Sequence, residues 1–152
     1  MLNRIESFIA AALEEFVTDT HRLLLAAEKH PQATTDTDVK EEIKFWCSQY
    51  NAFVKAQHRF LNGVRLTATA SGYTIPSASR PGALIHRLYK TGDIWLCSCE
   101  ARGFCWHHAL VCGYERGLEL ADLESREDAD DGPTPPAWMA DEDAQLLTLL
   151  AA

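Results

Sequence analysis

The fold of this chain is decided by the stretch WLCSCEARGFCWHH, residues 95–108. It holds three cysteines and a histidine with the spacing C-x-C-x5-C-x-H, namely Cys97, Cys99, Cys105 and His107. Side chains two residues apart at a strand end point to one face, so the first two cysteines converge with little bending. The glycine-containing loop that follows can reverse the chain. Amides at the start of a helix after Cys105 would favour its thiolate.

Three thiolates and an imidazole form the donor set of a tetrahedral zinc site. Separate buried cysteines beside a capping histidine are the alternative, which the tight spacing disfavours. Four protein ligands leave no open coordination position, so we expect one structural Zn²⁺ and no catalytic metal. Its binding energy, of order 10 kcal/mol, would fold the surrounding module. The adjacent His108 is an alternative to His107 as the fourth ligand.

Around this motif the pattern predicts strands and then a helix. Apolar residues alternate over 64–70, which predicts a strand with one buried face. Glycines and prolines at 72, 76, 81 and 82 predict turns. Residues 84–89 and 93–96 predict a β-hairpin with a tight connection at Thr91-Gly92. A helix is expected over 106–116, ended by Gly117.

The first 62 residues predict two antiparallel helices with a short loop between them. Asn3 and Glu6 resemble a capping box at the start of the first, and His30-Pro31 ends it. Asp38 and Glu41 form the second capping pair, and Asn62-Gly63 closes that helix because glycine readily adopts the left-handed conformation. The apolar stripe of the second helix includes Cys47, which we therefore expect in the core.

We therefore predict an α+β protein with three parts. Residues 1–62 form the helical hairpin, 63–118 a small β-sheet and helix around zinc, and 119–152 an acidic linker with a short C-terminal helix over 141–150. Residues 124–131, followed by a Gly-Pro-rich stretch, are the predicted linker. Their aspartates do not make a calcium loop, because Met139 stands where a bidentate glutamate is needed.

The motif resembles the SWIM zinc finger, whose pattern is CxC, a variable loop and CxH. The similarity covers about residues 64–116, including the strands upstream of the cysteines, and it favours His107 over His108 as ligand. SWIM modules are ββα domains that bind DNA or protein and have no catalysis of their own. The resemblance therefore implies a binding module in which zinc is structural.

The net charge of −8 argues against a general polyanion binder, but the charges are segregated. Residues 1–53 carry a net −4, 54–118 a net +5, and 119–152 a net −9. The basic middle contains the candidate nucleic-acid contacts Arg65, Arg87, Lys90 and Arg102. An ordinary solvated surface is the alternative explanation of this patch.

Two functions follow. The first is a zinc-binding accessory protein that contacts nucleic acid, DNA before RNA, and the second is a protein-interaction adaptor. An enzyme is not expected: His108 and Cys112 lie four apart, but no motif supplies an orienting carboxylate or an oxyanion hole. No small-molecule substrate or membrane partner is expected either. The short, acidic N-terminal apolar run does not fit a signal peptide, so we expect a cytoplasmic or nucleoid-associated protein with reduced cysteines.

Overall fold

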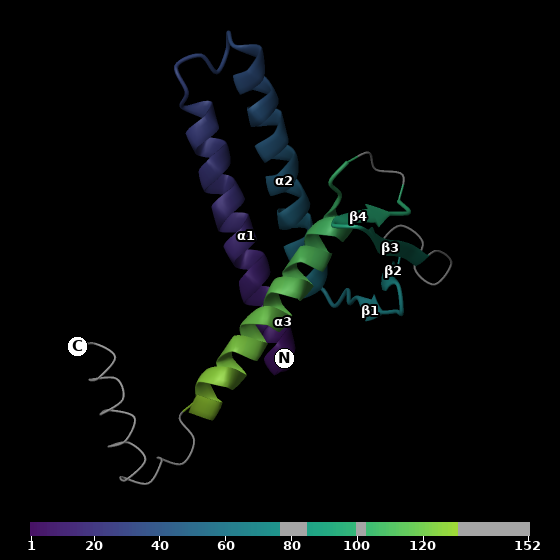
Figure 1. Cartoon of the computed structure of the whole chain (residues 1–152). Coiled ribbons are helices and arrows are strands. Elements are labelled where there is room, and N and C mark those ends of the chain that lie inside the picture. Colours follow the sequence, from purple (N-terminus) through teal and green to yellow (C-terminus); the bar gives the residue numbers. More distant parts are fainter. Residues whose placement is uncertain (77–84, 100–102, 131–152) are drawn as a thin grey trace, which may run out of the picture. The chain divides into compact units, whose positions relative to one another are not determined.

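The computed structural model describes residues 1–76, 85–99 and 103–130. The elements follow in the order α1 (Arg4–Glu28), α2 (Thr37–Leu61), β1 (Thr67–Ala68), β2 (Gly72–Pro76), β3 (Ile85–Thr91), β4 (Ile94–Cys97) and α3 (Trp106–Asp130) (Figure 1). A helical pair, an antiparallel sheet and a helix next to the cysteines confirm the predicted α+β class. The helix expected over 141–150 lies outside the described residues.

The chain divides into two compact units, Met1–Ala121 and Asp122–Ala152, and the first contains the sheet and all five cysteines. The three-part division predicted above stays a prediction. Within the described ranges, no helix combines the length and apolar character that a membrane span requires.

The helical hairpin begins as its sequence predicts. The Asn3 side chain accepts a hydrogen bond from the Glu6 backbone amide (2.8 Å), and the Glu6 carboxylate accepts one from the Asn3 amide (3.0 Å). This reciprocal capping box satisfies two amides that the first turn leaves unpaired. At the other end of the hairpin, Gly63 follows α2 with a φ of +98°, as the Asn-Gly signal predicts.

Two predictions about α2 are wrong. Its N-cap is Asp36, whose carboxylate accepts hydrogen bonds from the amides of Asp38 (2.8 Å) and Val39 (3.2 Å), so the helix begins earlier than predicted. Cys47, expected in the core, is exposed, and its sulfur accepts a hydrogen bond from the Asn51 side chain (3.6 Å). The stripe is wide enough to include positions at the edge of the buried face.

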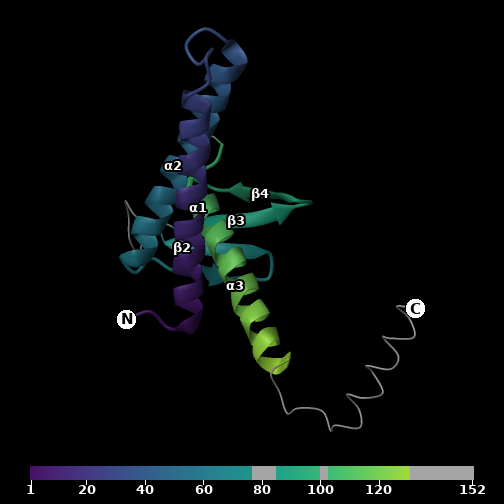
Figure 2. The same cartoon turned by 90° about the vertical axis from the view of Figure 1, so that its left-hand side faces the viewer.

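The sheet is antiparallel throughout, in the order β1-β2-β3-β4. Its two faces alternate along each strand. The inner face packs into the core through Ile75 and Leu88, which are 0% and 1% exposed. The β3–β4 hairpin extends away from α1 and α2 (Figure 2).

The sheet differs from the prediction at its first half. The strand expected over 64–70 is paired only at Thr67 and Ala68, because the Thr69 amide donates to the Gly72 carbonyl (2.8 Å) and reverses the chain. Gly72 and Pro76, predicted in turns, are instead the first and last residues of β2. Both pair with β3, opposite Tyr89 and Ile85.

Helix α3 does not end at Gly117, as predicted, but continues to Asp130 and includes most of the predicted acidic linker. Gly113 and Gly117 lie on its buried side against α1. A Cβ at Gly117 would lie 2.7 Å from the Cα of Ile9, and one at Gly113 would collide with the side chain of Leu13. The two glycines therefore let the backbones of α1 and α3 approach closely. This packing outweighs the glycine's low helix propensity.

Candidate metal centre

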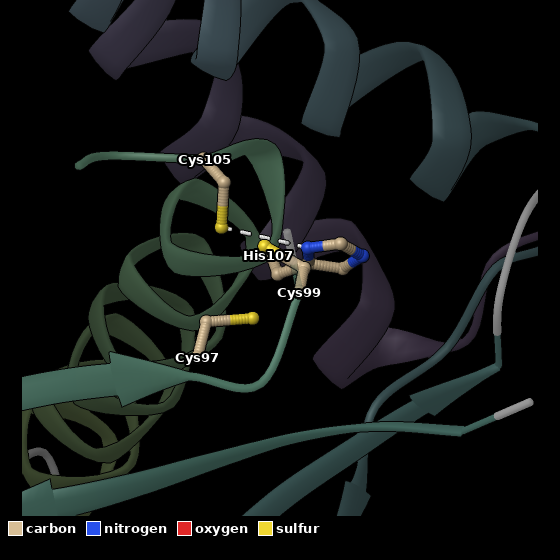
Figure 3. Close-up of side chains that lie close together, drawn as sticks. All are labelled: Cys97, Cys99, Cys105 and His107. Carbon is tan, nitrogen blue, oxygen red and sulfur yellow. Dashed lines mark hydrogen bonds between the residues drawn. The ribbon is translucent and has the colours of Figure 1, made fainter. Parts of the chain in front are cut away.

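The four predicted ligands lie together where the sheet meets α3. Their ligand atoms, three sulfurs and one imidazole nitrogen, are all within 4.8 Å of one another. Figure 3 shows Cys97 at the end of β4, Cys99 just beyond it, and Cys105 and His107 at the start of α3, with the side chains directed toward a common point. Cys105 and His107 are buried, and the other two are half-buried.

Local structure aims these side chains. Cys97 pairs with Leu88 of β3 and so lies on the inner face of the sheet. The Ser98 amide donates to the Arg87 carbonyl (3.0 Å), which holds the chain against β3 between the two cysteines. The Cys105 carbonyl accepts the first hydrogen bond of α3, from the Ala109 amide (3.1 Å), so Cys105 stands at the helix N-terminus. Helix amides there favour a negative sulfur.

The sulfurs are coupled by hydrogen bonds, and the five cysteines form no disulfide. The thiol of Cys97 donates to the sulfur of Cys105, which lowers the pKa of Cys105 and raises that of Cys97. His107 and His108 lower the pKa of Cys105 further, against the effect of burial. A thiolate is thus formed most readily at Cys105. Binding of a cation must displace the proton that Cys97 retains.

His107 faces the cysteines with one ring nitrogen. Its Nδ1 lies 3.5 Å from the sulfur of Cys105, and its Nε2 is buried with no hydrogen-bond partner in the described part of the chain. The ring centroids of His86 and Trp106 lie 4.5 and 4.0 Å away. Burial and proximity to His107 lower the pKa of His86. The ring of His107 is therefore held by contacts with two neighbouring rings.

His108, the alternative ligand, has a different set of contacts. Its Nε2 is 2.9 Å from the Trp95 carbonyl, to which it donates, and its Nδ1 is 3.0 Å from the sulfur of Cys105. Phe104 stacks on the ring at a centroid distance of 5.7 Å. Because one nitrogen is used by β4, His108 connects a candidate ligand to the strand. It belongs to the surroundings of the cluster, and His107 completes the set.

Cys112 lies outside the cluster. It packs against the core, and burial raises the pKa of its thiol to about 11. A raised pKa disfavours the thiolate that a nucleophilic cysteine needs. This supports the packing role over the pairing of Cys112 with His108.

The three basic residues of the predicted nucleic-acid patch that the structure describes, Arg65, Arg87 and Lys90, do not form one cluster. Arg65 donates to Glu6 (3.0 Å) and to the Phe60 carbonyl (2.6 Å), so it links the start of α1 to the end of α2. Arg87 and Lys90 are exposed on β3, on opposite faces of the sheet. Lys90 lies over the ring of Trp95, 5.9 Å from its centroid. Arg102 lies outside the described residues.

Two residues near the cluster could not be predicted from the cysteine and histidine motif. His86 reaches His107 from β3, which only the register of the sheet could predict. Arg59 of α2 lies 5.9 Å from the ring centroid of Trp106, and its Nε is buried without a hydrogen-bond partner in the described ranges. Arg59 places a positive charge beside the first residue of α3. Neither residue lies near the ligands in sequence.

Comparison with models of known protein families, with curated protein sequences and with solved structures found no match for this chain. The likeness to a zinc finger rests on the four-residue pattern and on the cluster that it forms.

Proposed function

We propose that the chain is a SWIM-like zinc module in which a structural Zn²⁺ joins β4 to α3, and that this module binds nucleic acid. The observation that carries the proposal is the convergence of three sulfurs and one imidazole nitrogen within 4.8 Å. A softer or harder donor set would suit other metals, but three thiolates with one imidazole suit zinc.

The distances support tetrahedral zinc. With Zn–S near 2.3 Å and Zn–N near 2.05 Å, a regular tetrahedron has S–N edges of about 3.6 Å and S–S edges of about 3.8 Å. The sulfur of Cys105 lies 3.5 Å from the Nδ1 of His107. Small movements of Cys97 and Cys99 would bring the remaining atoms, now within 4.8 Å, to those edges.

A structural role follows from the ligand count. Four protein ligands complete the coordination of zinc and leave no position for a substrate or a reactive water. The two segments that they join are a four-residue strand and a helix, which the hydrogen bond from the His108 Nε2 to the Trp95 carbonyl also connects. Zinc would then stabilise the sheet, and the protein would act by binding and not by catalysis.

Nucleic-acid binding is supported by the charge of the sheet region. Among described residues of 64–99, Arg65 is paired with Glu6, and Arg87 and Lys90 are the other cations against Asp93, the one carboxylate. The net charge of this region is positive, although the whole chain is acidic. Phosphates would therefore approach the sheet in preference to the helices.

The zinc proposal is tested by metal content and by thermal unfolding. We expect stoichiometric zinc in the purified protein, its loss in Cys105→Ser, and a lower Tm after chelation. Cys47→Ser is the matched control because Cys47 is exposed and outside the cluster. Well under one equivalent of zinc in the wild type, or equal losses in both variants, would overturn the proposal.

A protein-interaction adaptor is the second candidate, favoured by exposed aliphatic side chains on the sheet. Ile85, Ile94 and Leu96 are 59%, 66% and 41% exposed. If the chain is an adaptor, it should form a complex of defined stoichiometry with a partner protein and have no affinity for nucleic acid. Leu96→Asp should abolish that complex.

A further inference from the structure

The face of the sheet that points away from the core carries a cleft of about 630 Å³. We call this the outer face and define it by Thr74, Ile85, Arg87, Tyr89, Ile94, Leu96 and Ser98. The residues that line the cleft, most of which carry a hydroxyl group, are Thr69, Ser71, Tyr73, Thr74, Arg87, Leu88, Tyr89 and Ser98. The metal centre lies on the inner side and does not account for this cleft.

The polar part of the outer face is one row across the strands. Thr74 pairs with Arg87, and on the other side the Ser98 hydroxyl accepts a hydrogen bond from the Arg87 amide (2.8 Å). Arg87 thus lies between two hydroxyl-bearing residues in this row. Arginine, serine and threonine are among the side chains that contact phosphate oxygens.

The next row is apolar and aromatic. Tyr89 is 45% exposed and pairs with Leu96 on β4 and with Gly72 on β2. Because Gly72 has no side chain, nothing on that neighbouring position covers the tyrosine ring. An exposed aromatic ring on an open sheet face is a stacking platform for an unpaired base.

The two rows are spaced for one polynucleotide strand. Arg87 and Tyr89 are two residues apart on β3, roughly 7 Å along the strand. A phosphate at Arg87 and the base of a neighbouring nucleotide at Tyr89 can therefore be held together. In a duplex the bases are stacked on one another, and the flat face of a sheet cannot reach their planes.

We propose that the outer face binds single-stranded nucleic acid, with Arg87 holding a phosphate in the hydroxyl-lined cleft and Tyr89 stacking on a base. This inference rests on the proposed nucleic-acid function and specifies its ligand as a single strand. The exposed Leu96, in the row of Tyr89, and Ile94, in the row beyond it, offer further apolar surface to bases. DNA and RNA share the phosphates and the base planes, so the sugar decides between them.

The test is fluorescence anisotropy with the full, zinc-loaded chain. The probes are labelled oligothymidylate and oligouridylate of about fifteen nucleotides, within the range that small sheet domains occupy. A duplex of mixed sequence and heparin serve as competitors. We expect both single strands to bind, the duplex and heparin to compete poorly, and the ratio of the two affinities to identify the preferred sugar.

The variants separate stacking from charge. Tyr89→Ala should weaken binding about 5- to 100-fold, as loss of one stacked base does, whereas Tyr89→Phe should keep it. Arg87→Ala should weaken binding and reduce the slope of log affinity against log salt by about 0.7, the contribution of one phosphate in a single strand. Lys40→Ala is the control for charge, because Lys40 lies in the first turn of α2, at the end of the hairpin far from the sheet (Figure 1).

Zinc content and thermal unfolding are measured for each variant to check that it is folded. If Tyr89→Ala fails to fold, Tyr89→Leu replaces it, because leucine keeps the apolar contact but removes the ring. Three results would overturn this inference and leave nucleic-acid binding standing. They are tighter binding of the duplex than of the single strands, efficient displacement of the single strands by heparin, and unchanged affinity in Tyr89→Ala or Tyr89→Leu. No binding to any nucleic acid at low salt would overturn both proposals, and a protein complex abolished by Leu96→Asp would then favour the adaptor.

Discussion

The close packing of α3 on α1 predicts that Gly117→Ala destabilises the protein, although alanine is the better helix former. A Cβ at Gly117 would lie 2.7 Å from the Cα of Ile9 and 2.8 Å from its backbone nitrogen. Carbon atoms in good contact are about 3.5–4.0 Å apart, so the two helices would have to separate by about 1 Å. Ile9 is 2% exposed, and its backbone cannot move aside as a side-chain rotamer can.

The magnitude follows from two opposing effects. Alanine in place of glycine within a helix contributes about 1 kcal/mol of stability. Overpacking a buried contact costs about 1–3 kcal/mol, and contact with backbone atoms belongs at the upper end of that range. We expect a net loss of about 1–2 kcal/mol in the free energy of unfolding. For a chain of this size the loss corresponds to a Tm lower by about 2–8 °C.

Urea and thermal unfolding of the zinc-loaded protein measure this change. Ser48→Ala is the control, because Ser48 is exposed in α2 and its replacement alters helix propensity without a new contact. Its effect should stay within about 0.5 kcal/mol. If Gly117→Ala instead raises the Tm, helix propensity dominates at this position and the close contact between α1 and α3 is refuted.

Two further predictions concern the metal centre and the helical hairpin. His108→Ala should lower zinc affinity about 10- to 100-fold, because we expect His108 to contact a metal ligand and not the metal. Stoichiometric binding should persist at saturating metal, and competition with a chromophoric chelator measures both quantities. Loss of the bound zinc would show that His108 is itself a ligand. Asp36→Ala should destabilise the protein by about 1 kcal/mol in urea unfolding, since Asp36 caps α2. Asp38→Ala should have the smaller effect, and the reverse order would refute the cap assignment.

Helix starts and stops were predictable where the signal is local. Asn3 and Glu6 interact across three residues, and Gly63 acts through its own backbone, so the sequence around each position contains the full cause. Gly117 carries the same kind of stop signal but fails, because its role depends on Ile9 of α1. A distant packing partner decides whether a glycine ends a helix or lies within it.

The strands show the same limit. Gly72 and Pro76 favour turns by local preference, yet both lie at the ends of β2, where they pair with Tyr89 and Ile85 of β3. Proline is tolerated there because the end of a strand does not require its missing amide. The pairing partners follow a loop, so the register could not be inferred from the residues of β2 alone.

The parts of the candidate site that depend on residues close together in sequence could be predicted, and those that depend on distant residues could not. The four ligands fall within eleven residues, and their spacing alone predicts convergence. Arg65, by contrast, was assigned to a nucleic-acid patch, whereas its guanidinium donates to Glu6, 59 residues earlier. A cation with no partner nearby in sequence can form an ion pair within the fold, and only the tertiary structure identifies its partner.

The metal centre and the outer face are connected through one residue. Ser98 lies between Cys97 and Cys99, and while those two side chains turn toward the inner side, Ser98 is exposed and lines the cleft. Its hydroxyl and amide both bond to the backbone of Arg87. Zinc held by Cys97 and Cys99 would therefore fix Ser98 from both sides and, through it, the residue proposed to hold a phosphate. A metal that does not itself touch the nucleic acid can in this way set the geometry of the surface that binds it.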